Sequence, residues 1–152
     1  MDHQVVNPLY PYLPTIGVDF RAKLFVIGDN IFSEKIQLWD RQSNSAKFLP
    51  TSYFVNATFI FEMFSLMNRD TFDSLIEKSN HFNNFKNKEM ILLGTGSDDV
   101  QHSRCVSVRE ASKFAFEKLN GALYQEISLC ETFDAKSILW YACLLQYCLR
   151  EQ

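Results

Sequence analysis

The pattern of hydrophobic and polar positions changes its period several times along the chain. Two runs of β-forming residues flank residues 28–30, a Gly-Asp-Asn sequence that is a strong turn signal. They predict an antiparallel hairpin of Phe20–Ile27 and Lys35–Asp40. Residues 1–14 hold three prolines, each of which removes a backbone donor and restricts the residue before it. We therefore expect an irregular arm there, with at most a short strand near Val5.

Strand and helix patterns alternate after the hairpin. A nearly continuous apolar run from Ala57 predicts a strand that is covered on both faces. Glu62 lies inside this run and must either lie near the surface or have a partner, because an unpaired buried carboxylate is costly. A helical stripe follows at Phe72, Leu75, Ile76, Ser79 and Phe82. Residues 89–99 then predict a second buried strand that ends in a glycine-rich loop.

The last third of the chain continues the alternation. Ser107 and Glu110 have the spacing of a capping box, which marks a helix start, and Gly121 is typical of a helix stop. Residues 121–128 predict a last strand. Residues 134–152 predict a long final helix whose apolar stripes fit either a core helix or a partner groove. The whole pattern predicts an α/β fold with a mostly parallel sheet, an antiparallel edge hairpin and helices on both faces.

Composition narrows the classes of function. A chain of 152 residues that is 47% hydrophobic fits one domain with a sizeable core, and its net charge of −3 includes no basic tract for nucleic acid. The four cysteines and three histidines lack metal-ligand spacing, which favours reduced thiols in a cytosolic protein. The acids Asp98, Asp99 and Glu126 have no base or nucleophile beside them, so we expect no catalytic residue.

Six segments carry a resemblance to a known family. They are TIGVDF (15–20), KIQLWD (35–40), SYFVNA (52–57), ILLGTGSD (91–98), VREASKFAF (108–116) and YQEIS (124–128). Their order and spacing resemble those of Rab-type small GTPases, and the resemblance covers roughly residues 12 to 148. It implies that a Rab-like domain at 15–152, with a Ras-like (P-loop GTPase) fold, follows the irregular arm at 1–14.

The resemblance also predicts what the chain lacks. In Ras-like proteins a strand, the phosphate-binding P-loop and a helix precede the TIGVDF segment, but residues 1–14 hold neither glycine nor lysine. We therefore expect an incomplete fold without its first strand, P-loop and first helix. The gap between the hairpin and the next strand would then be filled by the arm, by closure of the two edges, or by a strand donated from another chain.

The nucleotide motifs are eroded at the matching positions. The resemblance places Thr15 and Asp40 at the magnesium-binding switch positions, Asp98 at the guanine-reading acid and Ser128 in the Ser-Ala-Lys loop. Asn44 stands where the family has the glutamine that orients the attacking water. We expect little or no GTP binding or hydrolysis and no cofactor. If GTP or GDP does bind, Thr15 and Asp40 are the magnesium positions.

The resemblance to Rab proteins also predicts a surface that binds protein partners. The aromatic triad that Rab partners recognise falls on Phe20, Trp39 and Tyr53, beside Ile16 and Val18, and exposed aromatic rings are typical binding anchors. The alternative is that Phe20 and Trp39 simply pack on a covered face of the hairpin.

Three functional hypotheses follow from this resemblance. The first is a Rab-like pseudo-GTPase that binds Rab effectors or regulators in vesicle-mediated protein transport. The second is a divergent GTPase with weak nucleotide binding, and the third is a truncated or splice product of a Rab gene. Cys148 does not form a prenylation box, so we expect a cytoplasmic protein without a direct lipid anchor, peripheral to membranes through its partners.

Overall fold

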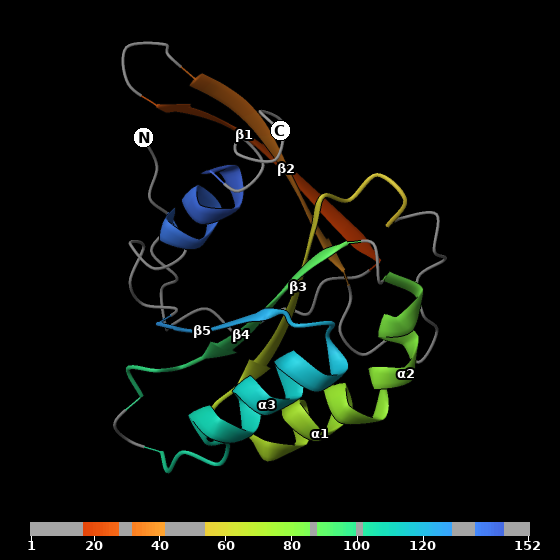
Figure 1. Cartoon of the computed structure of the whole chain (residues 1–152). Helices are drawn as coiled ribbons and strands as arrows, with labels where there is room; N and C mark the ends of the chain where they lie inside the picture. The colour runs from red at the N-terminus through yellow and green to blue at the C-terminus, as the bar shows by residue number, and fades with distance from the viewer. Residues whose placement is uncertain are drawn as a thin grey trace. The chain divides into compact units, whose positions relative to one another are not determined.

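The computed structural model describes residues 17–27, 32–41, 54–85, 88–99, 102–128 and 136–144. The chain divides into two compact units, Met1–Leu49 and Pro50–Gln152, which we describe separately (Figure 1). The boundary expected after residue 14 lies outside the described residues and stays a prediction.

The first unit contains the predicted antiparallel hairpin. Strand β1 (Val18–Ile27) pairs with β2 (Phe32–Arg41) along its whole length, from Val18 opposite Arg41 to Ile27 opposite Phe32. Both strands are longer than the sequence pattern indicated. Gly17 precedes β1 with a φ of +78°, a conformation that glycine adopts without strain.

The second unit contains a parallel sheet with the strand order β3-β4-β5. Its strands are β3 (Phe59–Ser65), β4 (Glu89–Thr95) and β5 (Leu123–Ile127). Five consecutive residues of β4 are buried, as expected for the central strand of a parallel sheet that is covered on both faces. The mostly parallel sheet predicted from the sequence is therefore confirmed.

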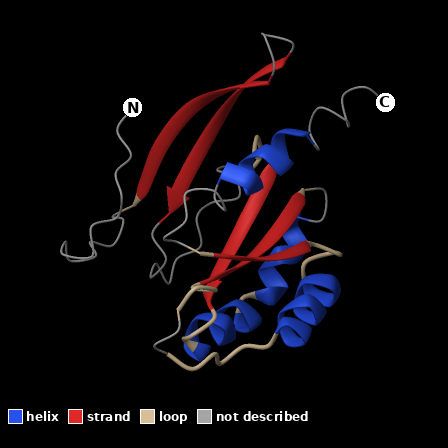
Figure 2. Cartoon of the chain, turned by 90° about the vertical axis from the view of Figure 1, so that its left-hand side faces the viewer, coloured by secondary structure: helices blue, strands red, loops and turns tan. Residues whose placement is uncertain are grey.

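Helices lie on both faces of this sheet (Figures 1 and 2). On one face, α1 (Arg69–Glu77) and α3 (Val108–Lys118) contribute Phe72, Leu75 and Phe114 to the main hydrophobic core. On the other face, the helical residues 136–144 contribute Ile138, which packs against a smaller cluster from β4 and β5. This agrees with the predicted arrangement of helices.

The helix ends follow local sequence signals. Ser107 Oγ accepts a hydrogen bond of 3.2 Å from the backbone N–H of Glu110, as the capping box predicts. The Glu110 carboxylate forms an ion pair with Arg69 at the start of α1, at 2.7 Å. Asn120 and Gly121 both have positive φ values, so the chain leaves α3 at the predicted stop.

The helical stripe over Phe72–Phe82 is interrupted, and this corrects the prediction of one helix. Helix α1 ends at Glu77, and α2 (Ser79–Phe82) and a 3-10 turn, η2 (Asn83–Phe85), follow Lys78. The backbone N–H of His81 donates to the Lys78 carbonyl at 2.9 Å, which tightens the chain after α1. The apolar spacing continues across the break, so the period alone does not reveal it.

Glu62 is buried and has an interaction partner, which is one of the two outcomes expected for a carboxylate in this run. Strands β1 and β2 form one sheet, and β3, β4 and β5 form another. The three expected ways of filling the gap before β3 stay predictions. The arm and the end of the final helix lie outside the described residues.

Candidate functional site

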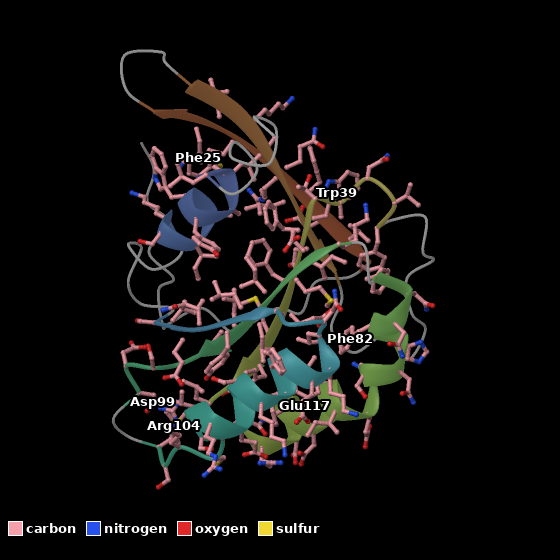
Figure 3. The ribbon with its side chains drawn as sticks, viewed as in Figure 1. Phe25, Trp39, Phe82, Asp99, Arg104 and Glu117 are labelled. Atoms are coloured by element: carbon pink, nitrogen blue, oxygen red, sulfur yellow. The ribbon has the colours of Figure 1, made fainter. Side chains whose placement is uncertain are left out.

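One face of the hairpin carries an exposed aromatic pair. Phe20 on β1 lies directly opposite Trp39 on β2, and their ring centroids are 4.9 Å apart at an interplanar angle of 58°. Trp39 is 60% exposed and Phe20 is 44% exposed (Figure 3 shows Trp39). Cross-strand aromatic pairs of this kind stabilise a hairpin while leaving ring surface accessible.

The same face continues along both strands. Successive residues of a strand point to opposite faces, so Val18, Phe20 and Leu24 lie on one side of the hairpin. Leu24 is 62% exposed, lies opposite Lys35, and was not singled out from the sequence. The even spacing of Leu24 and Phe20 along the strand was the sequence signal that could have placed Leu24 on this face. We call Val18, Phe20, Leu24 and Trp39 the hairpin surface.

Asp40 lies on the other face of the hairpin. It is directly opposite Asp19, whose carboxylate accepts hydrogen bonds from the backbone N–H of Phe20 at 2.8 Å and from Arg21 Nε at 3.4 Å. Trp39 and Asp40 are neighbours in sequence, but their side chains point in opposite directions. A partner on the hairpin surface therefore contacts the face that does not carry Asp40.

The second candidate site lies at the carboxyl ends of β4 and β5. The backbone N–H groups of Gly96 and Ser97 both donate to the Ile127 carbonyl, at 3.1 and 3.3 Å. These bonds hold the loop carrying Asp98 against the end of β5, where Ser128 follows. Asp98 is exposed and Ser128 is 5% exposed, so the two predicted positions lie on adjoining loops.

A polar cluster beside this site was missed by the sequence reasoning. Arg104 Nη2 donates to Glu126 Oε1, and Tyr124 Oη donates to the same oxygen at 2.7 Å (Figure 3 labels Arg104). Burial and this hydrogen bond raise the pKa of Tyr124 above its ordinary value of 10, so the phenol remains protonated. The hydrogen bond from Arg104 to Glu126 raises the pKa of Arg104 as well. Glu126 is thus a structural acid that is paired with two side chains.

Thr15, Ile16 and Tyr53 lie outside the described residues. The described nucleotide positions, Asp40, Asp98 and Ser128, comprise two acids and a buried hydroxyl, and none of the three is a cation that would meet a phosphate. No group of three metal-binding side chains gathers in the described segments.

The sequence is similar to known proteins over most of its length. Residues 9–143 match the family described as the Ras family. The chain is 32% identical to Ras-related protein RABC1 of Arabidopsis thaliana over 126 residues, which are 76% of this chain and 54% of that protein. It is 30% identical to Ras-related protein RabV of Dictyostelium discoideum over 110 residues, 68% of this chain and 45% of that protein.

A third relative matches a similar share of the chain. Ras-related protein RABA6a of Arabidopsis thaliana is 27% identical over 125 residues, which are 81% of this chain and 52% of that protein. The chain therefore spans about half the length of the curated relatives it matches. None of the helices in the described ranges is long and apolar enough to cross a membrane.

Proposed function

The chain belongs to the Ras family, with Rab proteins among its relatives, and from this premise we propose that it is a Rab-like protein-binding module with little or no GTP binding or hydrolysis. It would act in vesicle traffic by occupying Rab effectors or regulators. Rab proteins in general work through such protein partners, so the family supports the class of partner. The exposed Phe20–Trp39 pair carries the proposal.

The exposure of this pair supports a binding role. A large ring that serves only the stability of a hairpin is normally covered, whereas Trp39 leaves more than half of its surface accessible at 60% exposure. Tryptophan is among the residue types most enriched at the energetic centres of protein interfaces. Leu24 adds further exposed apolar surface on the same face, and Lys35 opposite it supplies a cation at the rim.

The position of Asp40 separates partner binding from any nucleotide role. Asp40 is the described residue that the resemblance assigns to magnesium, and it lies on the face of the hairpin away from Trp39. Recognition through the hairpin surface therefore needs no nucleotide contact from Asp40. A module of this kind presents one fixed surface to its partners without a GTP-driven switch.

Replacement of Trp39 by alanine is expected to weaken the capture of protein partners by at least about fivefold, because it removes the central anchor of the hairpin surface. The chain would serve as bait in a cell lysate, and captured proteins would be quantified by mass spectrometry. Leu38→Ala is the matched control, because Leu38 is the preceding residue, is 38% exposed and lies on the opposite face. Equal capture by wild type and Trp39→Ala would overturn the proposal.

A divergent GTPase is the second candidate function. It is favoured by the backbone bonds from Gly96 and Ser97 to Ile127, which bring Asp98 close to Ser128 as a base-binding loop pair would require. Fluorescent GTP and GDP would be titrated into the protein with Mg²⁺. We expect no saturable binding at micromolar concentrations. Micromolar or tighter binding that Asp98→Ala abolishes would establish the second candidate instead.

A further inference from the structure

Strand β5 ends the described sheet with one side unpaired. It is hydrogen-bonded to β4, and no strand in the described part of the chain pairs with its outer edge. Natural sheets usually protect such an edge with lysine, proline or a bulge. The sequence Leu-Tyr-Gln-Glu-Ile of β5 has neither lysine nor proline.

The charge on this strand is already neutralised. Glu126 is the one ionisable carboxylate in β5, and Arg104 and Tyr124 both bind its Oε1 atom. An edge strand without a free charge offers little electrostatic resistance to a second strand.

A cavity, called the hollow below, lies along β5 on the side that faces helical residues 136–144. It has a volume of about 370 Å³, and its lining includes Leu123, Ile127 and Ile138. A second hollow of about 490 Å³ adjoins it at Leu123 and Tyr141. Leu123 is 43% exposed and Tyr141 is 42% exposed, so apolar surface lies open next to the unpaired edge.

We propose that the outer edge of β5 pairs with β5 of a second copy of this chain, antiparallel and centred on Gln125. In this register Leu123 lies opposite the second copy's Ile127, and Tyr124 lies opposite the second copy's Glu126. Gln125, whose Nε2 donates to the Glu126 carbonyl at 3.3 Å within its own chain, lies opposite its own counterpart, and the second amide proton of each remains to bond across the pair. The side chains of Leu123 and Ile127 from the second copy enter the side that carries the hollow.

Self-complementarity singles out a second copy as the occupant. Centred on Gln125, the pairing uses all five residues, matches apolar with apolar positions, and keeps the single acid, which its own Arg104 and Tyr124 already bind, away from a second carboxylate. A register shifted by one residue sets Glu126 opposite Leu123, and centring on Glu126 sets two carboxylates opposite each other, which is destabilising. The interface lies in the second unit and uses none of the hairpin surface, so it stands independently of the proposed function.

Sedimentation velocity of the full chain, from micromolar to near-millimolar concentration, tests the proposal. We expect a reversible monomer–dimer equilibrium. Gln125→Lys and Gln125→Glu should each weaken it by about threefold to fivefold, because like charges then meet across the two-fold axis. An equimolar mixture of the two variants should associate at least as well as wild type. A monomer at all concentrations, or no recovery in the mixture, overturns the proposal.

Two controls test whether the effect of the Gln125 charge variants is specific to the edge of β5. Gln37→Lys introduces the same charge change at an exposed glutamine of the hairpin and should leave the association constant unchanged. Circular dichroism during urea unfolding should show equal stability for all Gln125 variants, because this side chain is exposed. A Gln37→Lys variant that weakens association as much as Gln125→Lys would count against the proposed edge.

A cysteine cross-link tests the register itself. Opposed residues of an antiparallel pair have Cα atoms about 4.5–5.5 Å apart, which lies within disulfide geometry. Gln125→Cys should therefore form a 125–125 disulfide on mild oxidation, identified by mass spectrometry of the linked peptides. Leu123→Cys lies opposite Ile127 and should not link to itself. Absence of the 125–125 peptide overturns this register.

Discussion

Replacement of Phe72 by alanine is expected to lower the free energy of unfolding of the second unit by about 3–5 kcal/mol. Phe72 is 1% exposed, and its ring centroid lies 4.8 Å from that of Phe64 on β3 and 5.3 Å from that of Phe114 on α3. Its removal leaves a cavity where two helices and the sheet meet. Because whole domains are stable by only about 5–15 kcal/mol, this change removes a large part of the total.

Urea unfolding followed by circular dichroism measures this loss. Phe116→Ala is the matched control, because it deletes the same side chain from α3 at a position that is 75% exposed. It should change the free energy of unfolding by about 0.5 kcal/mol or less. Similar losses for Phe72→Ala and Phe116→Ala would contradict the core that the structure describes.

Replacement of Leu66 by alanine is expected to cost about 2–5 kcal/mol, and this cost should depend on the residue at position 94. Leu66 is fully buried. A Cβ atom added at Gly94 would lie 2.9 Å from Leu66 Cδ2 and 2.9 Å from Tyr124 Oη. Gly94→Ala alone should therefore destabilise the protein by about 1–3 kcal/mol, because the added methyl group overpacks the core.

The double variant Leu66→Ala, Gly94→Ala reveals the contact between the two positions. The new methyl group partly fills the space that Leu66 vacates, so the double variant should lose less stability than the sum of the single losses, by at least about 0.5 kcal/mol. Leu75→Ala with Gly94→Ala is the control pair, because Leu75 is not one of the close neighbours of the added Cβ atom. If the stability losses of Leu66→Ala and Gly94→Ala simply added in the double variant, this would contradict the packing around Gly94.

Features that depend on neighbouring residues were predictable from the sequence. The capping serine Ser107 and the stop at Gly121 each rest on contacts within a few residues, and the hairpin was indicated by the turn signal at residues 28–30 between two β-forming runs. The break at Lys78 was not predicted, because the apolar stripe continues through it and the turn is set by backbone bonds. The parallel sheet with helices on both faces followed from the alternation of strand and helix patterns.

The candidate sites likewise contain residues that the sequence indicated and one pair that it did not. Phe20 and Trp39 follow from the family resemblance, and the register of the hairpin then brings them together on one face. The Arg104–Glu126 pair joins residues 22 positions apart, and its formation depends on how the loop before α3 lies against β5. No local period encodes such a contact, so the sequence pattern did not reveal that Glu126 is paired.

The division of the chain into two units gives each unit its own intrinsic fluorophore. The sequence holds two tryptophans, Trp39 in the hairpin and Trp140 in the helical residues 136–144. Trp39 is largely open to water, whereas Trp140 is half-buried, so we expect their emission spectra and their quenching by iodide to differ. The fluorescence of Trp39 would then report on the hairpin surface that we propose to bind partners, and the fluorescence of Trp140 would report on the second unit.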